Sequence, residues 1–146
     1  MKILSIEHAL PARRLTNAWV RERVQASNRD TLSPDDLALV DAKLMRFFAS
    51  AGTEIRYAVD EHESAPDLCL SAGRAALDTA GMAPADVELL LYVGVCRGWI
   101  EPAMANVVES ELGLVNATCF DVVDACASWL RAMQIAHRYL CSGVVK

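Results

Sequence analysis

Cys126 is the residue whose position in this sequence best suits covalent chemistry. It follows residues 118–123, whose apolar character predicts a short strand, and it begins the periodic segment 126–141, which predicts a helix. The carboxyl ends of strands are where α/β folds collect their sites. A helix N-terminus favours a thiolate, and its free N–H groups can receive the oxyanion of a thioester under attack. The junction predicts a nucleophile, with a buried structural thiol as the alternative.

The remaining cysteines and histidines give weaker signals. They are Cys69, Cys96, Cys119, Cys141, His8, His62 and His137. The odd number of cysteines and the lack of a C-x-x-C spacing predict no disulfide framework, and Cys119 and Cys141 are interpreted as core residues. None of the histidines forms a ligand-like pair with a cysteine in the sequence, so we expect no metal and no bound cofactor. Asp121 and Asp124 are expected to cap a helix or order a turn.

Alternating strand and helix signals predict an α/β architecture with mainly parallel strands. Strands are expected at residues 3–10, 86–95 and 118–123, and helices at 17–27 (with a break at 28–31), 34–51, 65–80, 102–112 and 126–141. Asn17 is expected to cap the first helix, and small residues in 65–80 predict close packing. A helix normally returns the chain to another strand, yet little sequence follows the last one. We therefore expect residues 1–146 to be one segment of a longer protein.

The composition narrows the class of protein. A length of 146 residues suits one domain, and 53% hydrophobic with 23% charged residues excludes a disordered tail. The net charge of −5 argues against nucleic acid as a partner. The apolar runs are too short for a membrane helix, and no secretory signal is visible. The sequence therefore predicts a cytoplasmic protein without a membrane partner.

Residues 120–128, F-D-V-V-D-A-C-A-S, and 139–143, Y-L-C-S-G, carry a family resemblance. They resemble the nucleophile segment of the β-ketoacyl-acyl-carrier-protein synthase III enzymes of the thiolase superfamily, which reads roughly D-V-x-x-A-C-A-G before a helix ending in S-G. Weaker pieces follow the family order: Leu10-Pro11 with Thr16-Asn17, Gly52 with Arg56, Pro102-Ala103 and Leu112-Gly113. The resemblance implies the N-terminal half of a thiolase-like α/β fold, with one βαβαβ-type unit.

The resemblance also implies an activity and partners. Cys126 would take an acyl group from a coenzyme A or acyl-carrier-protein thioester, with its own N–H in the oxyanion hole. A C-terminal half of the same enzyme would supply a His and an Asn, and complete units would form homodimers. Condensation in fatty acid or polyketide biosynthesis is implied. The alternatives are malonyl-type transfer to a natural-product hydroxyl or amine, and a noncatalytic thiolase-fold fragment.

Several positions depart from the family pattern. Asp124 replaces a small residue and Ser128 replaces a glycine beside the cysteine. The family's adenine-holding clamp is absent, although Arg46 is placed to stack on a base. By the resemblance, residues 99–101 occupy the region where members of the family place a residue that reaches the neighbouring subunit's acyl pocket. Substrate-binding roles are accordingly expected for Arg46, Trp99, Ile100 and Glu101.

Overall fold

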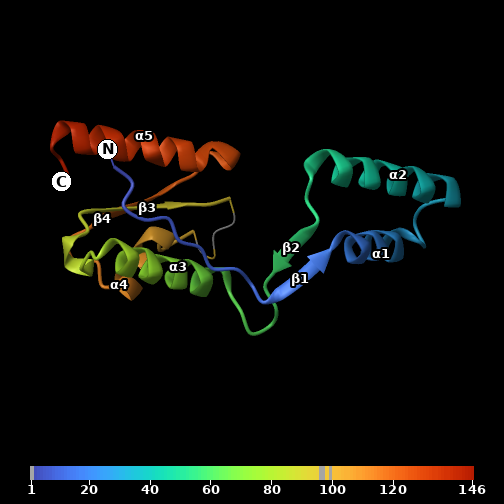
Figure 1. Cartoon of the computed structure of the whole chain (residues 1–146), viewed down its shortest axis with the longest axis horizontal. Helices are drawn as coiled ribbons and strands as arrows, with labels where there is room; N and C mark the ends of the chain where they lie inside the picture. Colours follow the sequence, from blue (N-terminus) through green and yellow to red (C-terminus); the bar gives the residue numbers. More distant parts are fainter. Residues whose placement is uncertain (1, 96–97, 99) are drawn as a thin grey trace. The chain divides into compact units, whose positions relative to one another are not determined.

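A computed structural model of the chain describes residues 2–95, 98 and 100–146. The chain divides into two compact units (Figure 1). The larger unit combines the N-terminal residues up to Ala9 with Ala65–Lys146, and the smaller unit is Leu10–Ser64. Each unit is described separately below.

The smaller unit joins two helices to a two-stranded antiparallel sheet. Its elements are β1 (Arg13–Thr16), α1 (Asn17–Asn28), α2 (Pro34–Ala51) and β2 (Ile55–Ala58). The predicted signals for α2 are confirmed. The Ser33 hydroxyl accepts a hydrogen bond from the Asp36 N–H at 3.2 Å, and Gly52 ends the helix with φ of +64°.

Asn17 does not cap α1 as predicted. The hydroxyl of Thr16 accepts the capping hydrogen bond from the Trp19 N–H at 3.2 Å. The Asn17 side chain instead donates to the Thr53 carbonyl at 2.9 Å and accepts from the Arg56 guanidinium at 2.7 Å. Arg56 itself lies in β2. Asn17 thus links the start of α1 to the segment that pairs with β1.

The larger unit contains a parallel pair of strands, as predicted. Its elements are α3 (Ala65–Ala80), a 3₁₀ turn at Pro84–Asp86, β3 (Leu89–Val93), α4 (Met104–Leu112), β4 (Thr118–Val122), a 3₁₀ turn at Ala125–Ala127 and α5 (Ser128–Ser142). β3 and β4 pair in parallel from Leu89 opposite Thr118 to Val93 opposite Val122. Because the first residues of the two strands are paired, and the last residues are paired as well, both strands end at the same edge of the sheet.

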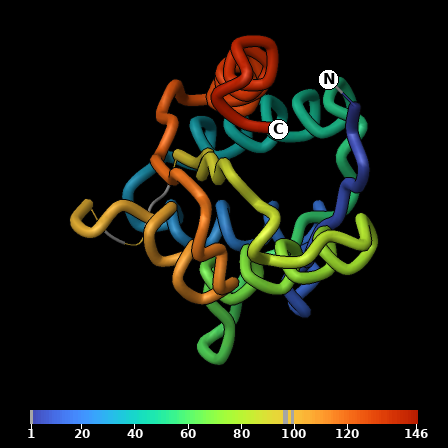
Figure 2. Tube along the Cα trace, turned by 90° about the vertical axis from the view of Figure 1, so that its left-hand side faces the viewer, coloured from blue at the N-terminus to red at the C-terminus, as the bar shows by residue number. Residues whose placement is uncertain are grey.

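Helices cover both faces of this strand pair. In the larger unit α5 lies on one face of β3 and β4, and α3 and α4 lie on the other (Figures 1 and 2). The most buried side chains belong to α4, where Met104 and Ala105 are 1% and 0% exposed. The predicted close packing of α3 is confirmed at Gly73, where an added Cβ would lie 2.9 Å from Leu112 Cδ1. α3 therefore packs on α4, which in turn contacts β4.

Residues 3–10 do not form the predicted strand. No strand is assigned to residues 2–12, and side-chain hydrogen bonds tie this segment to α3 instead. The Ser5 hydroxyl donates to the Ala76 carbonyl at 2.9 Å, and Thr79 donates to the Glu7 carboxylate at 2.8 Å. Apolar character alone therefore misled the prediction, since a strand requires a neighbour that pairs with its backbone. Among the described residues, no helix has the length and apolar character needed to cross a membrane.

Candidate active site

Cys126 lies at the predicted junction between a strand and a helix. It occupies the 3₁₀ turn Ala125–Ala127, which connects β4 to α5, and its side chain is exposed. The turn leaves the sheet at the end where β3 and β4 both stop. An exposed thiol at the carboxyl edge of parallel strands, just before a helix of 15 residues, is accessible to a ligand in solution.

The residue before Cys126 adopts an uncommon backbone conformation. Ala125 has φ of +42°, in the left-handed region that residues with a Cβ rarely enter. Strained residues of this kind persist only where the surroundings hold them, and they gather at functional sites. Here the Ala127 N–H donates to the Asp124 carbonyl at 2.9 Å, which closes the turn around Cys126.

Ser128 holds the same turn in place. Its hydroxyl accepts a hydrogen bond from the Asp124 N–H at 2.7 Å and donates one to the Ala125 carbonyl at 2.8 Å. The residue is 4% exposed, although most of the neighbouring turn is open to solvent. The serine that departs from the family's glycine is therefore a structural clamp across Ala125.

The carboxylate of Asp124 is paired with a cation. Its Oδ2 accepts hydrogen bonds from Arg131 Nε at 3.2 Å and from a terminal nitrogen of Arg131 at 3.1 Å. Arg131 also donates to the Gln134 side chain at 3.1 Å. The carboxylate two residues before Cys126 therefore has a guanidinium beside it.

Asp121 performs the capping task expected of it. Its carboxylate accepts hydrogen bonds from the backbone N–H groups of Met104, at 3.2 Å, and Ala105, at 2.8 Å. Both residues are buried at the start of α4, where the first N–H groups of a helix have no partner within the helix. A residue of β4 thereby anchors the N-terminus of α4 and fixes the strand that leads to Cys126.

The loop after β3 starts at the same sheet edge as the Cys126 turn. Ile100 is 84% exposed and Glu101 is also exposed. The parallel register places the start of this loop, and not the predicted substrate-binding residues Ile100 and Glu101 themselves, at the edge where the Cys126 turn begins. Trp99, which belongs to the same predicted group, lies outside the described residues, as does Cys96.

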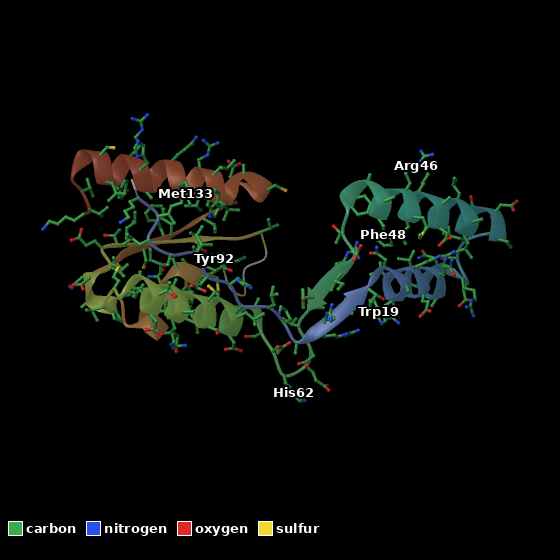
Figure 3. The ribbon with its side chains drawn as sticks, viewed as in Figure 1. Trp19, Arg46, Phe48, His62, Tyr92 and Met133 are labelled. Carbon is green, nitrogen blue, oxygen red and sulfur yellow. The ribbon has the colours of Figure 1, made fainter. Side chains whose placement is uncertain are left out.

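Arg46 belongs to the smaller unit. It lies on α2 with an exposed side chain, directed away from α1, whereas Phe48 points toward α1 (Figure 3). The Arg56 guanidinium packs 4.6 Å from the centre of the Phe48 ring. Stacking of Arg46 on a base thus stays a prediction.

The other described thiols differ from Cys126 in their surroundings. Burial raises the pKa of the Cys69 thiol. Burial, followed by the charges of Glu109 and Asp121, raises the pKa of the Cys119 thiol. Cys141 is exposed, so its assignment to the core is wrong, and its sulfur contacts His137 one turn earlier on α5.

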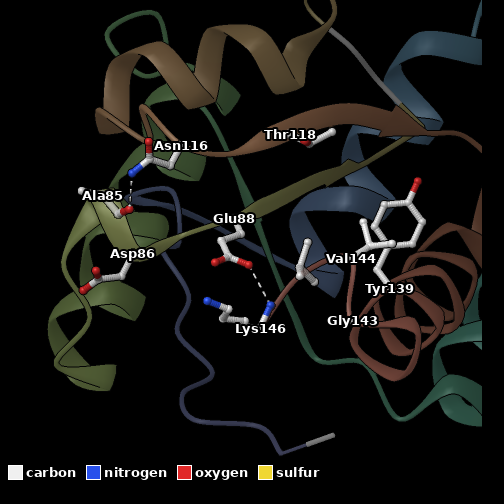
Figure 4. Close-up of a pocket in the computed structure, with 10 residues that line it drawn as sticks. Ala85, Asp86, Glu88, Asn116, Thr118, Tyr139, Gly143, Val144 and Lys146 are labelled. Carbon is white, nitrogen blue, oxygen red and sulfur yellow. Dashed lines mark hydrogen bonds between the residues drawn. The ribbon is translucent and has the colours of Figure 1, made fainter.

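A cavity of about 620 Å³ opens at the opposite end of the strand pair (Figure 4). Its lining includes Glu88 and Thr118, which stand at the amino ends of β3 and β4. The Glu88 carboxylate accepts a hydrogen bond from the Lys146 N–H at 2.7 Å. The cavity therefore lies apart from Cys126, and no cluster of three or more metal-ligating side chains occurs in the described part of the chain.

The fold of this chain is similar to that of proteins of known structure. No family model matches the chain. Among solved structures, acetamide-bound OleA of Xanthomonas campestris has a TM-score of 0.80 and 29% identity, covering 98% of this chain and 42% of OleA. A cysteine-to-serine OleA variant with bound lauric acid and lauroyl-CoA has a TM-score of 0.77 and 28% identity, covering 98% of this chain and 40% of that one. The chain thus has a thiolase-type fold.

Sequence relatives narrow the class further. The β-ketoacyl-[acyl-carrier-protein] synthase III of Neisseria meningitidis serogroup C is 33% identical over 117 residues, which cover 79% of this chain and 37% of the relative. The enzyme of the same name from Thiobacillus denitrificans is 30% identical over 146 residues, covering 99% of this chain and 41% of the relative. The chain resembles the N-terminal half of a synthase III-like protein of the thiolase superfamily, and it spans about two fifths of the length of these relatives.

Proposed function

We propose that Cys126 is the acyl-accepting nucleophile of a thiolase-superfamily condensing enzyme. The observation that carries the proposal is an exposed cysteine directly after a residue in the left-handed conformation, in the 3₁₀ turn between a parallel strand and a helix. The Cys126 thiolate attacks the carbonyl carbon of an acyl thioester and forms a new carbon–sulfur bond. The bond from that carbon to the sulfur of coenzyme A or of an acyl carrier protein breaks, and the departing thiolate takes up the proton that the Cys126 thiol released.

The geometry around Cys126 supports this reaction. Cys126 precedes the first residue of α5 by two positions, and the positive end of a helix dipole favours negative charge. The Cys126 N–H is proposed as one donor of the oxyanion hole. Pairing of Asp124 with Arg131 keeps a competing negative charge neutralised nearby.

The complete activity requires more than this chain. We propose that a C-terminal half, corresponding to the remaining three fifths of the relatives, supplies the His and Asn for decarboxylative condensation. The acyl group is then condensed with or transferred to a second acceptor, in a dimer of complete units in the cytoplasm. Arg46, Trp99, Ile100 and Glu101 are proposed to contact the thioester or its acyl group.

A second candidate function is favoured by the departures beside Cys126. Asp124 with Arg131, Ser128 and the missing adenine clamp suit a divergent homologue that transfers a malonyl-type acyl group to a hydroxyl or amine. Both candidates begin with the same acyl-enzyme. They differ in whether carbon dioxide is released, because decarboxylation belongs to condensation and not to ester or amide formation.

Acyl-enzyme formation is the test of the common step. The protein is incubated with acetyl-, malonyl- and longer acyl-coenzyme A, and its mass is measured. We expect an adduct on the wild type that is lost in Cys126→Ser, because an alcohol is far less acidic than a thiol and is a weak nucleophile without an adjacent base. Cys141→Ser is the matched control, since it removes another exposed thiol near the far end of the same helix.

Three outcomes would contradict the proposal. An adduct that survives in Cys126→Ser would place the nucleophile elsewhere, and one lost in Cys141→Ser would move it to that residue. No adduct with any thioester, from a folded wild-type protein joined by its C-terminal half, would support the noncatalytic alternative. Circular dichroism of each variant identifies any loss of fold.

A further inference from the structure

Asp124 is bound to α5 through both its main chain and its side chain. Its backbone N–H donates to the Ser128 hydroxyl at 2.7 Å. Its carboxylate Oδ2 accepts hydrogen bonds from Arg131 Nε at 3.2 Å and from a terminal nitrogen of Arg131 at 3.1 Å. Ser128 and Arg131 are three positions apart on α5, so they lie on adjacent turns of one side of the helix. The residue two positions before Cys126 is therefore held by α5 at two points.

The turn that carries Cys126 depends on these hydrogen bonds more than on burial. All residues from 123 to 127 are exposed, whereas Ser128 is buried. Asp124 has φ of −146° and ψ of 47°, which is neither helical nor extended, and Ala125 follows with φ of +42°. The Ala127 N–H donates to the Asp124 carbonyl at 2.9 Å. A displacement of Asp124 would therefore move the turn and the thiol with it.

The Arg131 guanidinium is itself held in place. Its other terminal nitrogen donates to the Gln134 side chain at 3.1 Å. A planar guanidinium offers its donors in a fixed arrangement, so little freedom is lost when it binds a carboxylate. We propose that Arg131 is a positioning residue for Cys126, because its ion pair with Asp124 keeps the turn in the conformation that presents the thiol. The inference rests on the proposed acyl transfer to Cys126.

The ion pair is a feature of this chain rather than of the family pattern. A small residue stands at the position of Asp124 in that pattern, and it would offer Arg131 no carboxylate. The two side chains are 56% and 44% exposed for Arg131 and Asp124, so the pair contributes little to the stability of the whole fold. The rate of a reaction, by contrast, depends steeply on how the reacting group is held. We therefore expect the pair to affect acyl transfer more than unfolding.

Acylation kinetics of variants test the proposal. The adduct on Cys126 is followed by mass spectrometry at several concentrations of acetyl-coenzyme A. We expect Arg131→Ala and Asp124→Ala each to lower the maximal rate constant about fivefold, with the half-saturating concentration unchanged. A purely electrostatic effect on the thiol would move the two variants in opposite directions. The charge swap, Asp124→Arg with Arg131→Asp, should recover much of the rate. Arg138→Ala, which removes another exposed cation of α5, should match the wild type.

Hydrogen exchange of residues 122–128 provides a measurement that needs no thioester. We expect faster exchange of this segment in Arg131→Ala, and in the wild type at about 1 M salt, because salt screens exposed charges. Urea unfolding of Arg131→Ala should be nearly unchanged. Wild-type kinetics or wild-type exchange in Arg131→Ala, or a charge swap no faster than the single variants, would each overturn the inference and leave the nucleophile in place. If the wild type forms no adduct, acyl transfer to Cys126 fails, and hydrogen exchange alone decides whether the pair holds the turn.

Discussion

The buried hydroxyl of Ser128 accepts a hydrogen bond from the Asp124 N–H at 2.7 Å and so spans the turn that presents Cys126. The same hydroxyl donates to the carbonyl of Ala125, the residue with φ of +42°. A glycine at position 128 would leave both backbone groups without this partner. The Ser128 hydroxyl therefore restrains the backbone of Ala125, the residue before Cys126.

Ser128→Ala tests this clamp. Loss of two hydrogen bonds to a 4% exposed hydroxyl is expected to lower the free energy of unfolding by about 1–2 kcal/mol. We also expect slower alkylation of Cys126, because Ala125 can relax out of the left-handed region. Urea unfolding and peptide mass spectrometry measure the two effects. Ser142→Ala is the control, since its hydroxyl donates to a carbonyl at the exposed end of α5, and an effect as large there would argue against a special role of Ser128.

Thiol labelling at neutral pH should separate the described cysteines into two groups. Cys126 and Cys141 are exposed and should react first with iodoacetamide. Cys69 and Cys119 should react slowly, because the pKa of each thiol is raised, mainly by burial, and the thiolate is the reactive form. Raising the pH should therefore increase the labelling rates of Cys69 and Cys119 more than the labelling rate of a fully accessible thiol. Equal and slow labelling of all four thiols would count against the proposal that Cys126 is the nucleophile.

Asp121→Ala should destabilise the larger unit more than Asp124→Ala. Asp121 accepts two hydrogen bonds from buried N–H groups of α4, and their loss is expected to cost about 1–3 kcal/mol. Asp124 makes an exposed ion pair with Arg131, which contributes about 0–1 kcal/mol. Asp121→Asn, which retains one acceptor oxygen, should fall between them. The urea unfolding midpoints of the variants provide the comparison. A larger loss of stability in Asp124→Ala than in Asp121→Ala would contradict the structural role given to Asp121.

Acid should weaken the smaller unit through Asp41. The hydrogen bond from Arg21, at 2.7 Å for the terminal nitrogen, holds the pKa of the Asp41 carboxyl below its usual value. The stabilisation is present above the unfolded-state pKa of about 3.9, and it is lost as the pH falls through the lower folded-state pKa. Amide hydrogen exchange in α1 and α2 should show this loss in the wild type and not in Asp41→Asn. Asp30→Asn is the control, and an unchanged acid response in Asp41→Asn would contradict the linkage.

Local sequence signals predicted most helices and the place of the candidate nucleophile. Ser33 and Pro34 at the start of α2, and Gly52 at its end, act through hydrogen bonds and backbone angles within a few residues, so the sequence specifies them directly. The apolar stretch of β4 followed by a periodic helix located Cys126 in the same way. Such signals need no knowledge of distant residues.

Tertiary structure decided which side chains act on one another. β1 and β2 are four residues each and pair across about 40 positions, so neither carries a local pattern strong enough to predict it. The pairing of Asp121 with the start of α4, and of β3 with β4 in register, likewise joins segments distant in sequence. Even the contact of His137 with Cys141 required the orientation of an exposed helix face, because spacing alone does not reveal which side of a helix the rest of the fold leaves open. Local hydrogen bonds are determined by neighbours in sequence, whereas burial and long-range pairing are determined by the folded chain as a whole.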